Sequence, residues 1–416
     1  MFEPSERLAR ALAALQGHYP QSIELSLGRI RELLDALGRP QDALPPVIHV
    51  AGTNGKGSTC AFLRAMAEAA GLSVHVYSSP HLVRFNERVR LAGELIGDDA
   101  FADALERTQL ALGSGQITHF EATTAAALLA FSETPADLLV LEVGLGGRFD
   151  ATNVIDTSEV AVISPVDYDH KQFLGDDLAG IAGEKAGIIR PSRPVVSAQQ
   201  SPVVAEVIAA RAQALGAPLH VLGDEDLARI TPPLALQGSH QIANAALAAK
   251  ALKVWGDDRI TPEAIESGSQ QANWPARMQR LSPGPLTQLA GGAEVWLDGG
   301  HNPHAARAVA ALLAEMPGDA VLVCAMMASK DAEGFFAGFR ALGPKVFTAP
   351  NAEGHEGRPP AELAQAARNA GLDGTASDSL EAALRQASAC RPARILICGS
   401  LYLAGEVLAM NGELPD

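Results

Sequence analysis

Short apolar runs alternate with longer stretches that place apolar residues at helical spacing along most of the chain. Before residue 276, the short runs that are almost continuously apolar are 45–50, 73–79, 136–146, 159–166 and 193–199. Strands that are buried on both faces have this pattern. The stretches with helical spacing include 58–71, 178–189 and 201–216. The alternation predicts an α/β fold whose mostly parallel sheet is covered by helices.

The pattern fades at 270–292, where Pro and Gly accumulate, and then restarts. Further strands are predicted at 294–300, 320–327, 345–350 and 393–400. We therefore predict a larger domain over residues 1–276, followed by a smaller Rossmann-like α/β domain over residues 277–416.

Composition narrows the function classes. The formal net charge is −16, so a general nucleic-acid role is not expected, because neutralising phosphates needs a basic face. The four cysteines have no CxxC spacing, which is typical of free thiols in a reducing compartment. No signal-peptide core is present, and the longest apolar run is too short to cross a bilayer. We expect a soluble, cytoplasmic protein without membrane partners.

The segment "HVAGTNGKGST", residues 49–59, follows a predicted strand and opens a predicted helix. Glycine-rich turns of this kind present backbone N–H groups to phosphate. The expected phosphate contacts are Asn54, Gly55, Lys56, Gly57 and Ser58. The spacing departs from G-x-x-x-x-G-K-[ST], since Gly57 separates Lys56 from Ser58. A strand-to-helix turn with an exposed lysine and a P-loop kinase or switch remain alternatives.

Longer segments carry a resemblance to a known family. In order along the chain they are "SSPHLVRFNERVR", "HFEATTAAALL", "EVGLGGRFDATNV", "DYDHKQFLG", "EKAGII", "SHQIANAALA", "LDGGHNPHAA" and "ICGSLY". Together with the glycine loop they resemble the folylpolyglutamate synthases of the Mur-ligase superfamily, and specifically bacterial members that are also dihydrofolate synthases. The resemblance runs from about residue 20 to residue 405.

The resemblance implies an ATP-dependent acid–amino-acid ligase of folate biosynthesis. Its members activate a carboxylate as an acyl phosphate, which the amine of L-glutamate then attacks. The implied substrates are dihydropteroate and reduced folates such as tetrahydrofolate, with ATP as cosubstrate and one or two Mg²⁺ ions. We expect a monomer. The alternatives are a folylpolyglutamate synthase alone, a cell-wall amino-acid ligase, or a P-loop regulatory NTPase.

The resemblance also implies roles for particular residues. The implied Mg²⁺ ligands are Ser79, Glu142 and His170, and the further ATP contacts are Asn244, Arg277, Asp298 and His301. The implied catalytic residues are Lys56, His170 and Lys185, of which Lys185 is carbamylated by CO₂ in many members. Implied pterin contacts are Ile23, Glu24, Leu25, Thr118, His119, Phe120, Glu121, Phe149, Asp150 and Ala151.

Residue chemistry supports some of these roles more than others. A carboxylate such as Glu142 at the end of a buried strand is costly unless it meets a cation. Imidazole is a minority ligand for Mg²⁺, so His170 could instead be a loop histidine bonded to Asp169. Lys185 could be an ordinary surface lysine, and Phe120 and Phe149 could be core residues.

Overall fold

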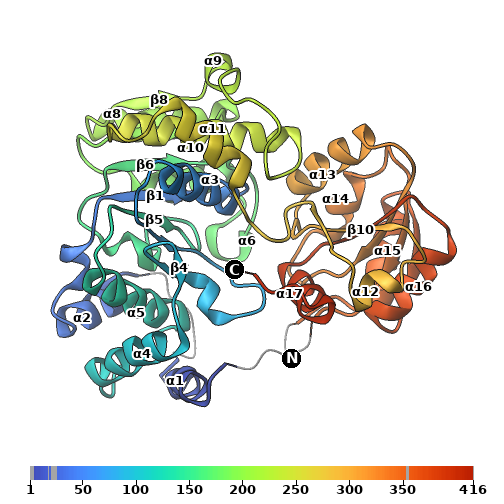
Figure 1. The fold of residues 1–416 in the computed structure, drawn as a ribbon, viewed down its shortest axis with the longest axis horizontal. Coiled ribbons are helices and arrows are strands. Elements are labelled where there is room, and N and C mark those ends of the chain that lie inside the picture. Colours follow the sequence, from blue (N-terminus) through green and yellow to red (C-terminus); the bar gives the residue numbers. More distant parts are fainter. Residues whose placement is uncertain (1–3, 17, 20–25, 353–355, 416) are drawn as a thin grey trace.

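Two separate β-sheets form the centre of the molecule, and helices cover both faces of each sheet (Figure 1). The structure is a computed structural model, and it describes residues 4–16, 18–19, 26–352 and 356–415. None of the described helices is long and apolar enough to cross a membrane.

The first sheet has the strand order β4-β3-β2-β5-β1-β6-β7-β8. Its strands from β2 to β8 in that order are parallel, and the hairpin strands β3 and β4 run antiparallel at one edge. The strands are β1 (Val47–Ala51), β2 (Val74–Tyr77), β3 (Val89–Leu91), β4 (Glu94–Leu95), β5 (Leu138–Glu142), β6 (Val160–Ile163), β7 (Val195–Ser197) and β8 (Leu219–Val221).

Alternate side chains of this sheet enter two different helical layers. Val47 and Leu139 pack against the helices α1 (Glu6–Gln16), α2 (Gly28–Ala36), α4 (Asp98–Leu112) and α5 (His119–Glu133). Ile48 and Val140 face the opposite layer, which contains α3 (Lys56–Ala69), α10 (Ser239–Trp255) and α11 (Pro262–Gln271). Further helices and 3₁₀ turns of this part are η1 (Pro40–Ala43), η2 (Phe85–Arg88), η3 (Ala151–Val154), α6 (Lys171–Leu174), α7 (Leu178–Lys185), η4 (Ala186–Ile188), α8 (Pro202–Ala214) and α9 (Asp224–Leu227).

The second sheet has the order β13-β12-β11-β14-β10-β9, and β9 is its antiparallel edge. The strands are β9 (Gln279–Arg280), β10 (Glu294–Leu297), β11 (Ala320–Cys324), β12 (Lys345–Thr348), β13 (Asp373–Ala376) and β14 (Arg394–Cys398). Its helices are α12 (Pro285–Gln288), α13 (Pro303–Glu315), α14 (Ala332–Ala337), α15 (Pro360–Asn369), α16 (Leu380–Ala389) and α17 (Leu401–Asn411).

These two sheets confirm the predicted fold class. Each long apolar run that was predicted to be a strand contains one. The pattern did not indicate β3 or the edge strands β4, β8, β9 and β13, because these strands are short and carry polar or half-exposed residues. A domain boundary at residue 276 stays a prediction, and it falls between α11 and β9.

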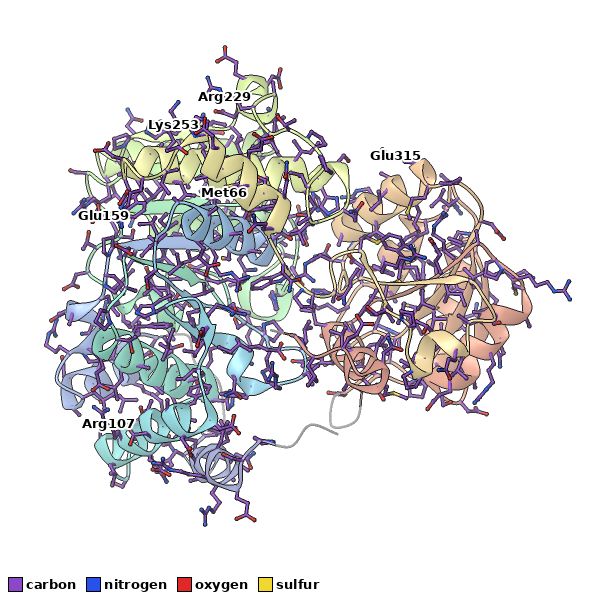
Figure 2. All side chains as sticks on the ribbon, in the orientation of Figure 1. Met66, Arg107, Glu159, Arg229, Lys253 and Glu315 are labelled. Atoms are coloured by element: carbon purple, nitrogen blue, oxygen red, sulfur yellow. The ribbon has the colours of Figure 1, made fainter. Side chains whose placement is uncertain are left out.

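The contact between α3 and α11 depends on a glycine. Gly268 lies on α11, and a Cβ at this position would come within 2.3 Å of the Met66 Cα on α3. Met66 itself is fully buried (labelled in Figure 2). Glycine therefore allows the two helix backbones to approach closely near the C-terminal end of α3.

We expect Gly268→Ala to lower the free energy of unfolding by about 1–3 kcal/mol, the usual cost of overpacking. Urea unfolding followed by circular dichroism measures the change. The matched control is Gly183→Ala on α7, where the nearest atom to an added Cβ lies 3.8 Å away, so no loss is expected. Equal stability of the two variants would contradict the close helix contact.

Candidate active site

A cavity of about 870 Å³ lies where the carboxyl ends of the two parallel sheets face each other. In open α/β sheets ligands bind at this edge. The cavity is lined by nearly every predicted site residue that the structure describes: Asn54, Gly55, Lys56, Gly57, Ser58, Ser79, Thr118, His119, Phe120, Glu121, Glu142, Phe149, Asp150, Ala151, His170, Asn244, Arg277, Asp298 and His301. Ile23, Glu24 and Leu25 lie outside the described residues.

The phosphate loop is the segment between β1 and α3, residues 52–55. A Cβ at Gly52 would lie 1.9 Å from the Ser164 Oγ, so this position, which has a φ of 149°, accepts only glycine. The side-chain amide of Asn54 accepts a hydrogen bond from Asn302 Nδ2 of the second sheet's domain at 2.9 Å. Its own Nδ2 is buried and has no partner among the described residues. A donor is therefore left for a ligand in the loop.

Two lysines meet at the carbonyl oxygen of Gly52. Lys56 Nζ donates to this oxygen at 3.2 Å, and Lys185 Nζ donates to it at 2.9 Å. Lys185 ends α7, and its side chain is buried behind the loop rather than in the cavity wall. Burial and the nearby Lys56 charge lower the pKa of Lys185 to about 7. A large fraction of Lys185 is therefore the neutral amine near neutral pH.

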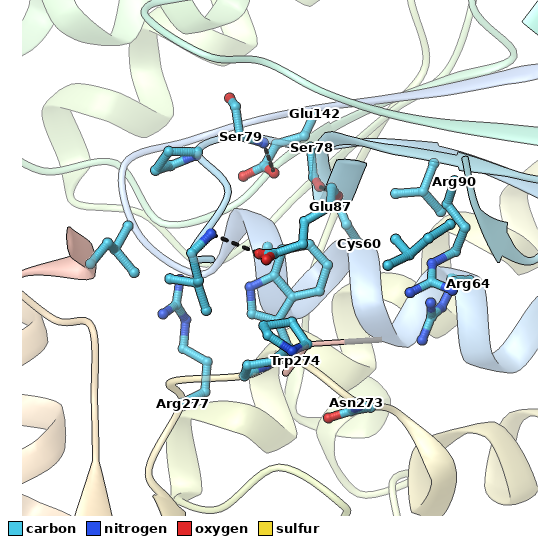
Figure 3. A pocket seen from close by; sticks show the side chains of 18 residues that line it. Cys60, Arg64, Ser78, Ser79, Glu87, Arg90, Glu142, Asn273, Trp274 and Arg277 are labelled. Atoms are coloured by element: carbon cyan, nitrogen blue, oxygen red, sulfur yellow. Dashed lines mark hydrogen bonds between the residues drawn. The ribbon is translucent and has the colours of Figure 1, made fainter. Parts of the chain in front are cut away.

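The three predicted metal ligands line the same cavity. Glu142 ends β5 and is 3% exposed, and its Oε2 accepts a hydrogen bond from the Ser79 N–H at 3.3 Å (Figure 3). Burial raises the pKa of Glu142, while the Lys56 charge opposes that rise. In the described part of the chain, no three His, Cys, Asp or Glu side chains come together as a metal cage. The carboxylate of Glu142 and the hydroxyl of Ser79 are oxygen ligands of the kind that Mg²⁺ prefers, with water and phosphate completing its shell, whereas the His170 imidazole is a less usual ligand for this ion.

Asp169 lines the cavity, and the sequence did not predict it as a site residue. Its carboxylate accepts a hydrogen bond from Lys330 Nζ at 2.6 Å and lies 3.4 Å from His301 Nε2. Burial alone would raise the pKa of Asp169, but the hydrogen bond and charge of His301, with the charges of His170 and Lys330, lower it well below the usual range. Both partners come from the second sheet's domain, so this contact joins the two domains. The only indication in the sequence that Asp169 belongs to the site was its place in the motif "DYDH", residues 167–170.

His170, next to Asp169, has a φ of 51° and the backbone N–H bonded to the Asp169 carboxylate at 2.8 Å. The pKa of His170 is lowered to about 4, mainly by burial. Its imidazole is therefore neutral near pH 7, as a metal ligand must be.

The chain segment between the two sheets places Arg277 against the cavity. Its neighbours Ala276 and Met278 have positive φ angles of 56° and 43°. Asp298 holds this turn, since its Oδ2 accepts the Met278 N–H at 2.9 Å and its Oδ1 accepts the Gly300 N–H at 2.7 Å. Arg277 also lines a smaller adjoining cavity of about 70 Å³, which Glu142 lines as well (both are labelled in Figure 3).

The wall contributed by α5 carries the predicted pterin contacts. Thr118 caps the helix and donates its backbone N–H to Glu121 Oε2 at 2.8 Å. Arg29 Nε donates to the same oxygen at 3.2 Å. The other oxygen of Glu121, Oε1, is buried without a protein partner in the described chain. Across the cavity, Phe149 is 42% exposed, so it is not a core residue.

Further cavity residues had no sequence prediction. Phe173, which is 42% exposed, Tyr402 and His240 also line the cavity. Phe173 lies in the quoted segment "DYDHKQFLG", and Tyr402 in "ICGSLY", but nothing in their spacing marked them as site residues.

Comparisons with known proteins agree with this geometry. Residues 276–401 match the family model for the Mur ligase glutamate ligase domain. The dihydrofolate synthase/folylpolyglutamate synthase of Escherichia coli is 34% identical, over 96% of this chain and 94% of that protein. The structure of E. coli FolC in complex with DHPP and ADP has a TM-score of 0.85 at 33% identity, with 98% of each chain covered.

A third similar structure is the bifunctional enzyme of Yersinia pestis complexed with AMPPNP and Mn ion. It has a TM-score of 0.83 at 32% identity and covers 98% of this chain and 99% of that chain. The shared fold and sequence define the class of the protein, an ATP-dependent ligase of the Mur ligase type. Within that class, the chain belongs to the dihydrofolate synthase/folylpolyglutamate synthase family.

Glu142→Gln keeps the side-chain volume and removes the charge. We expect turnover to fall at least about 100-fold, with little rescue by high Mg²⁺, because a neutral amide is a poor metal ligand. Turnover measured as a function of Mg²⁺ concentration tests this expectation. The matched control is Glu68→Gln, a half-buried carboxylate on α3 whose pKa is also raised by burial and which does not line the cavity. Normal activity of Glu142→Gln at ordinary Mg²⁺ would place the metal elsewhere.

Proposed function

We propose that this cavity carries out two reactions, the glutamylation of dihydropteroate to dihydrofolate and the extension of tetrahydrofolate by L-glutamate. Both acceptors present a carboxylate to the γ-phosphate of ATP, so one centre serves both. The carboxylate attacks the phosphate and forms an acyl phosphate and ADP. The amine of glutamate then displaces inorganic phosphate and forms the amide.

The observation that carries this proposal is the unpaired Glu121 Oε1 in a cavity that also contains the phosphate loop. A buried acceptor without a partner is costly, and the ring N–H and amino groups of a pterin supply the missing donors. Phe149 offers an exposed phenyl face on the same cavity for the ring. A regulatory NTPase would not need an acceptor of this kind.

The phosphate end of the cavity has the charges that phosphoryl transfer requires. The ammonium of Lys56 and the guanidinium of Arg277 are the cations that would meet the triphosphate. A divalent metal ion bound by Glu142, Ser79 and His170 would supply charge neutralisation at the phosphates. Asn244, Asp298 and His301 are proposed contacts for the rest of the nucleotide.

L-Glutamate brings two carboxylates of its own, which need cations on the second domain's side. Lys330 lines the cavity there, and in this structure its ammonium pairs with Asp169. We assign the phosphate loop and the pterin contacts to residues 1–276 and the glutamate contacts to residues 277–416, which also contribute Arg277, Asp298 and His301 to the nucleotide site. The cavity draws all of these groups from one chain, which supports a monomer. Free cysteines support a cytoplasmic location, and nucleic acid is not an expected partner.

The first test uses Glu121→Gln. The amide replaces the unpaired acceptor by a group that can present an N–H, so the KM for dihydropteroate should rise about 10-fold or more while the KM for ATP stays within twofold. Glu133→Gln is the matched control, since it lies at the other end of α5 and also pairs with an arginine, Arg107. In the parent enzyme, ADP should form only when glutamate and a pterin acceptor are both present.

An unchanged dihydropteroate KM in Glu121→Gln would remove Glu121 from the pterin site. Activity with tetrahydrofolate but none with dihydropteroate in the parent enzyme would leave a folylpolyglutamate synthase alone. ADP formation without either cosubstrate would favour a regulatory NTPase.

The second test concerns a carbamate on Lys185. Only the neutral amine reacts with CO₂, and the lowered pKa of about 7 makes that form dominant at pH 8 and minor at pH 6. With ¹³C-bicarbonate, a carbamate resonance should therefore be strong at pH 8 and weak at pH 6, and it should be absent in Lys185→Ala. Lys250→Ala, which removes a lysine paired with Asp226, is the control that keeps the resonance. An unmodified Lys185 in the active enzyme at pH 8 would contradict the carbamate hypothesis.

A further inference from the structure

Three buried polar side chains form a hydrogen-bonded chain that ends at the cavity. His49 Nε2 lies 2.9 Å from Thr152 Oγ1, and the Thr152 hydroxyl donates to Asp150 Oδ1 at 2.5 Å. His49 and Thr152 are fully buried and Asp150 is 4% exposed. Of the three, only Asp150 lines the cavity. The chain therefore links the interior of the sheet to one of the proposed pterin contacts.

The direction of these hydrogen bonds follows from their donors. Thr152 has one hydroxyl proton, and the carboxylate can only accept, so that proton goes to Asp150. The threonine oxygen must then accept from His49, which fixes the Nε2–H tautomer. The pKa of His49 is lowered to about 3, mainly by burial and also by the Arg190 charge, so the ring is neutral at physiological pH. Its Nδ1, a bare lone pair in this tautomer, has no partner in the described chain.

Asp150 is held from its other sides as well. Its Oδ2 accepts the Leu145 N–H at 2.8 Å, and its Oδ1 also accepts the Thr152 N–H at 3.0 Å. These contacts cap the η3 turn and fix both the position and the rotation of the carboxylate. The His49–Thr152 pair adds a further contact from strand β1, which the segment around Asp150 does not provide by itself.

The hydrogen-bonded series from His49 to Asp150 begins on β1, the strand that leads into the phosphate loop. His49 lies on β1, which pairs with β5 on one side and β6 on the other, three residues before Gly52. Another strand of the same sheet, separated from β1 by β5, offers a contrast. His75 on β2 is equally buried, but its Nε2 bonds to the Thr134 carbonyl and its Nδ1 accepts the Ala92 N–H, both at 2.9 Å. The hydrogen bonds of the His75 ring thus go only to backbone groups, whereas His49 is linked through Thr152 to a carboxylate that lines the cavity.

We propose that His49 and Thr152 are positioning residues for the pterin acceptor, because they hold the Asp150 carboxylate at a fixed position relative to the phosphate loop. The inference rests on the proposed pterin role of Asp150. A pterin bound to a fixed Asp150 presents its distant carboxylate at a fixed place relative to the γ-phosphate. Misplacement by a fraction of an ångström reduces such a reaction strongly, since the acceptor and the phosphate must approach in line.

The deciding variants are Thr152→Val, which keeps the shape and removes the hydroxyl, and Thr152→Ser, which keeps the hydroxyl. Thr152→Val should raise the KM for dihydropteroate about 10-fold and leave the KM for ATP within twofold, and Thr152→Ser should restore most of the difference. The matched control is Thr108→Val, a fully buried threonine on α4 whose hydroxyl donates to the Ala104 carbonyl at 2.7 Å. That variant should lose stability without a change in either KM.

The same comparison is repeated at His49, the other end of the hydrogen-bonded series. His49→Gln keeps a donor and His49→Leu removes it. His75→Leu is their matched control, and Thr152→Val decides the question if a histidine variant does not fold. Thermal midpoints are measured for all variants. A Thr152→Val enzyme that loses stability like Thr108→Val but keeps the parent KM for dihydropteroate would overturn the inference.

Asp150→Ala separates this outcome from a failure of the proposed function. If Asp150→Ala raises the KM for dihydropteroate and Thr152→Val does not, Asp150 contacts the pterin and the positioning role is wrong. If Asp150→Ala leaves that KM unchanged, the pterin role of Asp150 is wrong, and the positioning role fails with it. A rise in both variants, with rescue by Thr152→Ser, supports the chain from His49 to the pterin.

Discussion

The carbonyl oxygen of Gly52 is the point on which the phosphate end of the site depends. The side-chain nitrogens of Lys56 and Lys185 both donate to this one oxygen. Burial, together with the nearby Lys56 charge, lowers the pKa of Lys185 to about 7. The oxygen itself is available only because Gly52 has no Cβ and can approach Ser164 at the end of β6. Lys56, which lines the cavity, carries the positive charge that a triphosphate would neutralise at this point.

The second constraint is that neither sheet's domain completes the cavity alone. Asp169, from the first domain, holds Lys330 and His301 of the second. On the other side of the cavity, Leu82 and Val83 pack into the apolar core of the second domain. Helix α17 approaches this loop so closely that a Cβ at Gly405 would clash with the Leu82 carbonyl oxygen at 1.9 Å. Leu82 and Val83 belong to the segment between β2 and η2, which also contains Ser79. The position of Ser79 therefore depends on the packing of this segment against the second domain.

How far the sequence predicts this arrangement depends on the kind of contact. Strands with continuous apolar residues and the glycine loop were predictable, because burial on both faces and phosphate binding impose strong local patterns. The predicted residues of the site converge on one cavity because strands and loops of a parallel sheet end at the same edge. Their individual roles remain predictions. Asp169 and Lys330 were not predictable as a pair, since they lie 161 residues apart and come together only through the packing of the two sheets' domains.

The polarity of the cavity follows from which buried atoms lack partners. At the phosphate loop the unpaired group is a donor, Asn54 Nδ2, and at the α5 wall it is an acceptor, Glu121 Oε1. A donor suits the oxygens of a triphosphate, and an acceptor suits the N–H groups of a pterin. If the triphosphate occupies the loop and the pterin the α5 wall, as proposed, the acceptor substrate lies with its ring toward α5 and its carboxylate toward the loop, and the reverse orientation would leave Glu121 Oε1 unpaired. In this proposal the hydrogen-bonding capacity of the α5 wall sets the direction in which the substrate is held.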